Sequence, residues 1–225
     1  MKISFDIELK RNPHKGMFVA LEGIDGSGKS TQLELLKKYF EDKGRSVLAT
    51  KFPRRNEGIL ARIMTSALLG NTSIPKPAFQ YLFSADYIMQ TDEEIVPALK
   101  RGDLVITDRF HCWSSVAYGL WENNPTYDIS LAQSQLVIST LLSQGYQSFV
   151  PDKTFYFSVP VETAVSRLSE MRKKKEMYED PEAMSKIIKG YEWLIKEFPK
   201  EFDVLDAAMP LAELTQNIVQ RIEHE

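Results

Sequence analysis

Short apolar runs alternate along the chain with longer segments in which apolar residues recur every three or four positions. The short runs are typical of buried strands and the longer segments of amphipathic helices. Strands are expected at residues 17–22, 46–52, 104–107, 154–159 and 202–205. Helices are expected at residues 32–40, 57–69, 77–100, 127–142, 161–175, 181–198 and 211–222, with Pro97 bending the third of these or beginning a new segment. This alternation predicts an α/β fold, with a parallel sheet covered by helices on both faces.

Residues 1–16 form a separate, mostly polar extension. Within it, Ile3, Phe5, Ile7 and Leu9 alternate with polar residues, which fits either a half-buried strand or a loose leader that packs where it can. We favour the leader because chain termini are usually poorly ordered. Residues 17–225 contain no linker long enough to divide them, so they are expected to form a single domain.

Composition and charge restrict the partners of the protein. The 225 residues include 28 Lys and Arg against 31 Asp and Glu, a net charge of −3, which argues against a protein held on nucleic acid by bulk positive charge. No apolar run approaches the roughly 18 residues of a membrane span, and the polar start lacks the apolar core of a secretion signal. Cys112 is the only cysteine, so no internal disulfide can form and a reducing, cytoplasmic location is expected.

The strongest chemical signal is a glycine-rich stretch directly after the first expected strand. Residues 23–30 read Gly-Ile-Asp-Gly-Ser-Gly-Lys-Ser and match the G-x-x-x-x-G-K-[ST] pattern of a phosphate-binding loop, with an amphipathic helix behind it. The glycines let successive backbone N–H groups point at phosphate oxygens, and the helix N-terminus adds the positive end of its dipole. Lys29 is expected to reach the β- and γ-phosphates of a nucleotide, and Ser30 to bind Mg²⁺.

A second acid distinguishes among the enzymes that share such a loop. The third expected strand ends in Asp108-Arg109. An acid at the end of a neighbouring strand can hold Mg²⁺ or its waters, and an arginine beside it can bind a second phosphate through two parallel hydrogen bonds. The chain has no N-K-x-D motif for reading guanine, which argues against a GTPase.

These motifs are similar to those of a known family. Residues 18–32 closely resemble the opening of the thymidylate (dTMP) kinases, P-loop nucleoside monophosphate kinases that transfer the γ-phosphoryl group of ATP to dTMP. The resemblance continues in residues 52–55 (Phe-Pro-Arg-Arg), 82–86 (Leu-Phe-Ser-Ala-Asp), 108–110, 114–118, 178–179 and 205–208. It implies a P-loop NTPase-like fold with a five-stranded parallel sheet, a short helical lid at about residues 167–180, Mg²⁺ as cofactor, ATP and dTMP as substrates, and a homodimer.

The resemblance also implies a role for individual residues. Catalysis would fall to Lys29, Asp108, Arg109, Arg167 and Arg172, and the metal ion to Ser30 and Asp108. ATP would be bound by Gly23, Asp25, Gly26, Ser27, Gly28, Lys29, Ser30, Thr31, Asp206 and Ala207. The acceptor dTMP would be bound by Asp25, Phe52, Arg55, Phe83, Tyr87, Arg109, Ser114, Ser115, Tyr118 and Tyr178. Within that set Arg55 would grip the acceptor phosphate and Phe83 would stack on the thymine.

The sequence departs from the family pattern at several positions. Tyr87 stands where the family usually has an arginine that reads the thymine carbonyl, Met177 replaces the arginine of the lid motif, and Trp113 looks like an insertion before the serine segment. Some members carry a catalytic cation in the P-loop at the position of Gly26, so here the lid is expected to supply it, through Arg172 first and Arg167 second. Two alternatives therefore stay open: a kinase for another pyrimidine nucleotide or a deoxynucleoside, and a nucleotide-binding regulator without turnover.

Overall fold

The computed structural model describes residues 10–54, 58–122, 149–171, 176 and 178–224. Several expectations from the sequence lie outside these residues. They are the alternating segment before Lys10, the helix at 127–142, the acceptor-phosphate residue Arg55, and the lid residues Arg172 and Met177.

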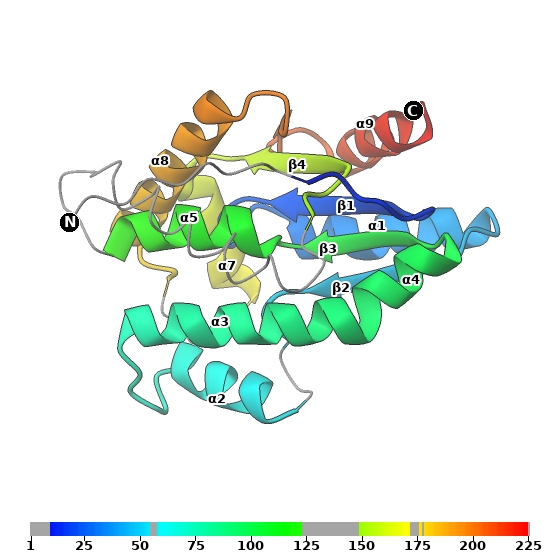
Figure 1. Ribbon diagram of the computed structural model, residues 1–225. Coiled ribbons are helices and arrows are strands. Elements are labelled where there is room, and N and C mark those ends of the chain that lie inside the picture. Colours follow the sequence, from blue (N-terminus) through cyan, green and yellow to red (C-terminus); the bar gives the residue numbers. More distant parts are fainter. Residues whose placement is uncertain (1–9, 55–57, 123–148, 172–175, 177, 225) are drawn as a thin grey trace.

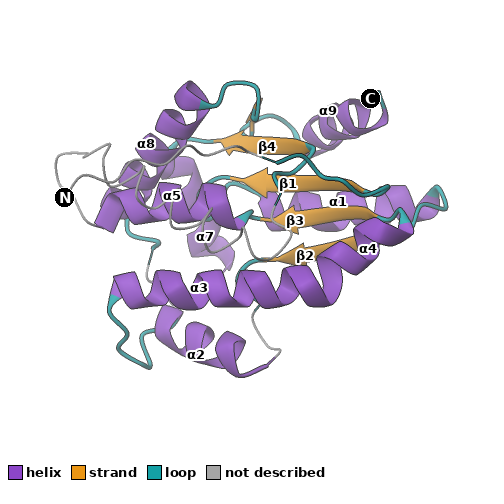
Figure 2. Cartoon of the chain, in the orientation of Figure 1, coloured by secondary structure: helices purple, strands orange, loops and turns teal. Residues whose placement is uncertain are grey.

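A five-stranded parallel sheet forms the centre of the molecule. Its strands are β1 (Met17–Glu22), β2 (Val47–Lys51), β3 (Leu104–Asp108), β4 (Lys153–Ser158) and β5 (Asp203–Asp206). They are ordered β2-β3-β1-β4-β5, and every neighbouring pair is parallel. The strand arrows accordingly point in one direction in Figure 2. Because Leu21 is in register with Asp108, the carboxyl ends of β1 and β3 lie side by side at one edge. The predicted α/β fold with a parallel sheet is confirmed.

Helices cover both faces of this sheet, with α1, which contacts α9, on one face and α5 with α8 on the other (Figure 1). The described helices are α1 (Lys29–Asp42), α2 (Gly58–Leu68), α3 (Lys76–Gln90), α4 (Val96–Arg101), α5 (His111–Glu122), α7 (Val161–Met171), α8 (Pro181–Glu197) and α9 (Leu211–Glu223), with a π-helical turn η1 (Thr91–Ile95) between α3 and α4. None of them combines the length and the apolar character that a membrane span requires.

Two helical regions contain features that were not expected from the sequence. The expected helical stretch over 77–100 is confirmed, since α3, η1 and α4 follow one another without a break, and the π-helical turn η1 within it was not expected. Pro97, which has no N–H to donate, lies in the first turn of α4. The sequence pattern also missed α5 altogether. Residues 111–118 are all buried, but His111, Ser114 and Ser115 recur at helical spacing and were the signal that could have revealed this helix.

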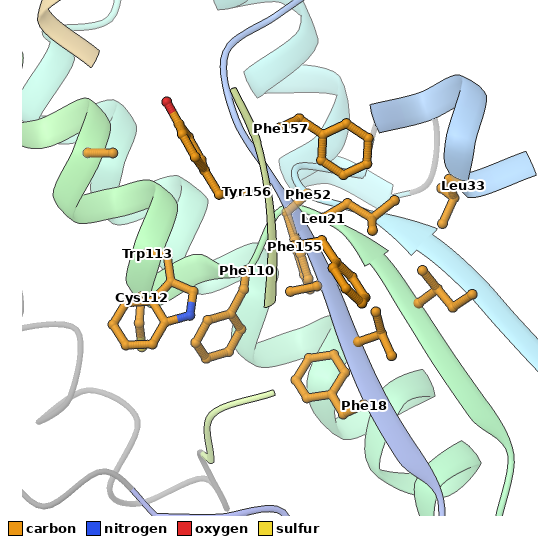
Figure 3. Close-up of a cluster of buried hydrophobic side chains, with 14 of the residues drawn as sticks. Phe18, Leu21, Leu33, Phe52, Phe110, Cys112, Trp113, Phe155, Tyr156 and Phe157 are labelled. Atoms are coloured by element: carbon orange, nitrogen blue, oxygen red, sulfur yellow. The ribbon is translucent and has the colours of Figure 1, made fainter. Parts of the chain in front are cut away.

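Alternate residues of β1 point to opposite faces of the sheet and build two layers of core. Phe18 packs edge-on against Phe110 at 5.9 Å, on the face that α5 and α8 cover. In Figure 3, Phe110 and Trp113 lie on one side of β1, and Leu33 and Phe157 on the other. Glu22, the last residue of β1, follows the same alternation and therefore points to the face of Phe18, where no water reaches its carboxylate.

Residues 10–16 of the extension bind to the domain near the amino ends of the strands. Asn12 donates from Nδ2 to Asp152 Oδ2 at 2.8 Å, and the same oxygen accepts the backbone N–H of Phe18 at 2.7 Å. Arg11 forms a bidentate ion pair with Glu201, and the Gly16 N–H donates to the Leu99 carbonyl. The described part of the extension is therefore attached to the domain on the side away from the carboxyl ends of β1 and β3.

Candidate active site

The glycine-rich loop between β1 and α1 encloses the Lys29 ammonium group. Gly28 takes a left-handed conformation just before α1, and Lys29 is the first residue of that helix. Its Nζ donates to the carbonyl oxygens of Gly23 at 3.0 Å and Ile24 at 2.8 Å. Burial, together with the nearby Arg109 guanidinium, lowers the Lys29 pKa to about 8. The loop therefore folds around the Lys29 ammonium group, the cation that the motif predicts for phosphate binding.

Ser30 and Asp108 meet at the edge of the sheet. The Ser30 hydroxyl donates to Asp108 Oδ2 at 2.7 Å, although the two residues are 78 positions apart in the chain. The other oxygen, Asp108 Oδ1, is buried and has no hydrogen-bond partner among the described residues, while the Lys29 ammonium lies 4.0 Å away. A hydroxyl and a carboxylate that share one position are oxygen ligands of the kind that Mg²⁺ prefers. The residues present therefore fit a magnesium ion.

Arg109 has an unusual backbone and a side chain held from several sides. Its φ of 83° lies in the left-handed region, which is uncommon for residues other than glycine. The guanidinium donates to the Gly23 carbonyl at 2.9 Å and to Asp25 Oδ1 at 2.6 Å, and it stacks over the Tyr118 ring with 4.7 Å to the centroid. Strained residues of this kind concentrate at functional sites.

The surroundings of Gly26, the fourth residue of the phosphate-binding loop, leave no room for a side chain. Its φ of 79° is left-handed, and a Cβ added there would lie 2.4 Å from the Ala164 carbonyl oxygen of α7. A real Cβ never approaches a backbone oxygen so closely. The packing of α7 on the loop therefore excludes any side chain at this position, including a cationic one.

A cavity that is open to solvent lies beside the loop. Seven of the residues predicted for the acceptor line it: Asp25, Phe52, Phe83, Arg109, Ser114, Tyr118 and Tyr178. The other lining residues, Pro53, Leu68, Phe79 and Glu176, were not among those predicted to bind the acceptor. The cavity is aromatic and apolar on the side of α3, and Arg109 supplies a cation beside the phosphate-binding loop, so its chemistry suits a planar base that carries an anionic group.

Two further residues predicted for the acceptor lie behind this lining. Tyr87 packs against Phe52, with 5.0 Å between ring centroids, and against His111 at the same distance. Ser115 Oγ forms a hydrogen bond of 2.7 Å with His111 Nδ1, and burial lowers the His111 pKa to about 3. Neither Tyr87 nor Ser115 lines the cavity.

The remaining predicted residues gather on the other side of the loop. Arg167 of α7 donates to the carbonyl oxygens of Ala207 at 3.0 Å and Ser27 at 3.4 Å, and so joins the loop after β5 to the phosphate-binding loop. Asp206 accepts the Ala208 N–H and thereby shapes the same turn. Thr31 is exposed in the first turn of α1. This places the residues predicted for the nucleotide around one loop.

One buried carboxylate at the site was missed in the sequence. Glu22 is wholly buried and accepts hydrogen bonds from the Phe110 N–H and from the hydroxyls of Ser114 and Tyr191. A charged residue at the end of an otherwise apolar strand was the signal that could have revealed it. Its partner Tyr191, on α8, carried no signal in the sequence.

Together, the strand–loop–helix unit with its enclosed lysine, the serine–aspartate pair and the neighbouring arginine define a P-loop phosphotransferase that acts on a nucleotide. Comparison with known proteins narrows this class. The family model of the thymidylate kinases matches residues 21–218. The chain is 33% identical to a probable thymidylate kinase of Pyrococcus horikoshii over 214 residues, which cover 94% of this chain and 98% of the relative. It is 32% identical to a thymidylate kinase of Chlamydia felis over 201 residues, 87% of this chain and 91% of the relative. The chain belongs to the thymidylate kinase family.

Proposed function

We propose that the protein transfers the γ-phosphoryl group of ATP to dTMP, giving ADP and dTDP. The observation that carries this proposal is the position of Arg109, which contacts the phosphate-binding loop through Gly23 and also lines the neighbouring cavity. A cation shared by two adjacent sites is what transfer between two phosphates requires. The family membership of the chain supports the same reaction.

The chemical step needs positioning and charge compensation more than covalent help. An oxygen of the acceptor phosphate attacks the γ-phosphorus of ATP, the bond from that phosphorus to the bridging oxygen breaks, and ADP leaves with the electron pair. Lys29 stabilises the β- and γ-phosphates, and Arg109 holds the acceptor phosphate in line. Phe83 lines the cavity, and its ring stacks on the base.

Mg²⁺ is proposed as the cofactor, held by Ser30 and Asp108, because their oxygens meet at 2.7 Å and Asp108 Oδ1 has no hydrogen bond of its own within the described residues. When bound, the ion neutralises charge on the β- and γ-phosphates. Asp108 and Ser30 supply its protein ligands, and Asp25 orients Arg109 on the acceptor side.

The lid is proposed to supply a further cation to the transferring group. Gly26 cannot bear a side chain, for the steric reason given above. Arg167 is bonded to the Ala207 and Ser27 carbonyls, which suits a role in holding the ATP side together. Arg172, outside the described residues, is therefore our first choice, and its replacement by alanine should lower kcat more than it changes KM.

We also propose a homodimer and a cytoplasmic location. On α2, Ile59 and Ile63 are exposed to solvent by 67% and 37% and could take part in a subunit contact, whereas Leu68 of the same helix is buried beside the cavity. Sedimentation analysis of the wild-type protein measures the oligomeric state directly, and a monomer would contradict this part of the proposal.

An assay of ADP release with dTMP, dUMP, dCMP and thymidine as acceptors tests the proposed function. We expect the highest kcat/KM with dTMP. A preference for another pyrimidine nucleotide is the second candidate, and Tyr87 favours it because it packs behind Phe52 rather than in the cavity lining. Preference for thymidine would contradict the monophosphate acceptor, and ATP binding without turnover on any acceptor would indicate a regulator. The Lys29→Ala variant is the control and should lose turnover.

A further inference from the structure

The backbone on both sides of Arg109 is held by the end of β1. The Arg109 N–H donates to the Leu21 carbonyl at 2.9 Å, and the next N–H, that of Phe110, donates to Glu22 Oε1 at 2.5 Å. Phe110 directly precedes α5, so its N–H has no partner within the helix and would otherwise be left unsatisfied in the core. The Leu21 carbonyl and the Glu22 carboxylate thus each bind one of the two peptide groups between which the left-handed Arg109 lies.

The Arg109 side chain is linked to the same carboxylate through Tyr191. The Tyr191 hydroxyl donates to Glu22 Oε2 at 2.6 Å and accepts from the Arg109 guanidinium at 3.4 Å. Ser114 donates to Glu22 Oε2 at 3.0 Å, so the carboxylate is surrounded by donors. Burial raises the pKa of Glu22, and the Arg109 guanidinium with the donor groups around it opposes that rise. A carboxylate whose neighbours all donate is suited to its ionised form.

We propose that Glu22 and Tyr191 are positioning residues for Arg109, which set the direction in which its guanidinium meets the acceptor phosphate. Neither residue lines the cavity, so neither contacts the acceptor. The physical reason is that a guanidinium grips a phosphate through parallel hydrogen bonds, and this needs a fixed orientation as well as a charge. Through Tyr191, this hydrogen-bonded group includes a residue of α8. Gly190 lets α8 pack close to α5, since a Cβ at Gly190 would lie 2.7 Å from the Ala117 carbonyl oxygen of α5.

The test compares the binding of dTMP and of thymidine, which differ only in the phosphate, by isothermal titration calorimetry. This inference rests on the proposed contact of Arg109 with the acceptor phosphate, so Arg109→Ala is measured beside Tyr191→Phe and Glu22→Gln. We expect Tyr191→Phe and Glu22→Gln to weaken dTMP binding about tenfold, the effect of losing one hydrogen bond to a charged group, with thymidine binding unchanged. Tyr156→Phe is the matched control, because the Tyr156 ring packs against the Tyr191 ring, with 5.0 Å between centroids. This variant should leave the affinities for dTMP and for thymidine unchanged.

Each outcome decides the inference. Selective loss of dTMP affinity in Tyr191→Phe supports it, and this conservative variant carries the test alone if Glu22→Gln does not fold. Equal weakening of dTMP and thymidine would indicate a merely structural role and overturn it. Unchanged dTMP binding in Tyr191→Phe, with a loss in Arg109→Ala, would overturn the positioning role while leaving the proposed function intact. Unchanged dTMP binding in Arg109→Ala would contradict the proposed contact between Arg109 and the acceptor phosphate, and the inference with it.

Discussion

At the scale of single residues, the site depends on charged groups that are held away from water. Lys29 is 4% exposed and bonded to backbone carbonyls, and the burial that positions it also brings its pKa down to about 8. Asp108 and Arg109 are consecutive in the chain but bind different partners: the carboxylate accepts from Ser30, and the guanidinium donates to Asp25. At each of these positions the site therefore needs both the right type of side chain and the right orientation of that side chain.

The lowered pKa of Lys29 predicts an alkaline limit to ATP capture. A lysine whose pKa lies at about 8 is charged below that pH and neutral above it, so kcat/KM for ATP should fall as pH rises through about 8. In the complex, the phosphates favour the charged form and raise the pKa, so kcat should fall only at higher pH. Steady-state kinetics between about pH 6 and 10 measure both profiles.

The matched variant for this pH profile is Lys29→Arg. A guanidinium stays charged across the whole range, so whatever activity this variant keeps should lack the fall near pH 8. The interpretation would be wrong if the wild-type and Lys29→Arg profiles were the same.

At the scale of elements, close helix contacts decide how the site is assembled. α7 packs on the phosphate-binding loop at Gly26, and α8 packs on α5 at Gly190. In both places a glycine meets a backbone carbonyl of the other element, of Ala164 and of Ala117. These contacts bring Arg167 to the loop and Tyr191 to Glu22, side chains that no local pattern would have connected.

The Gly190→Ala variant tests this helix contact, since the two relevant effects have opposite signs. Alanine is favoured over glycine inside a helix by about 1 kcal/mol. The new Cβ, however, would lie 2.7 Å from the Ala117 oxygen, and overpacking of this kind costs about 1–3 kcal/mol. We expect a net loss of stability in urea unfolding. Ser185→Ala, an exposed substitution on the same helix, is the control and should change stability little; a stabilised Gly190→Ala protein would show that the helices can separate freely.

At the scale of the whole molecule, the nucleotide site and the attachment of the extension lie at opposite ends of the strands. The loop after β1 and the residues after β3 build the site at the carboxyl ends, whereas residues 10–16 contact the amino ends through Asp152, Leu99 and Glu201. Stability and catalysis can therefore be altered separately.

This separation predicts that Asp152→Ala lowers stability without lowering activity. The substitution removes the acceptor of the buried Phe18 N–H and of the Asn12 amide, and an unsatisfied buried donor costs about 1–3 kcal/mol. Arg11→Ala breaks a pair whose arginine is 63% exposed, so its effect should stay within about 1 kcal/mol. Urea unfolding compares the two variants, and an equal effect of both, or a fall in kcat at a temperature where Asp152→Ala is folded, would contradict this prediction.

The sequence by itself determined the features that depend on neighbours in the chain. Residues 23–30 specify their loop, because the glycine, lysine and serine positions act within one strand–loop–helix unit, and the apolar runs specify all five strands of the sheet. The residues of the thymidylate kinase motifs likewise indicate the family to which the chain belongs.

Only the tertiary structure decided which distant residues meet. Glu22 and Tyr191 are 169 positions apart, and such a contact follows from sheet order and helix packing, which no local pattern records. The same holds for Tyr87, whose place behind Phe52 depends on the packing of α3 against α5. Local chemistry can be predicted from the chain, but the orientation of Arg109 depends on long-range packing that only the folded molecule supplies.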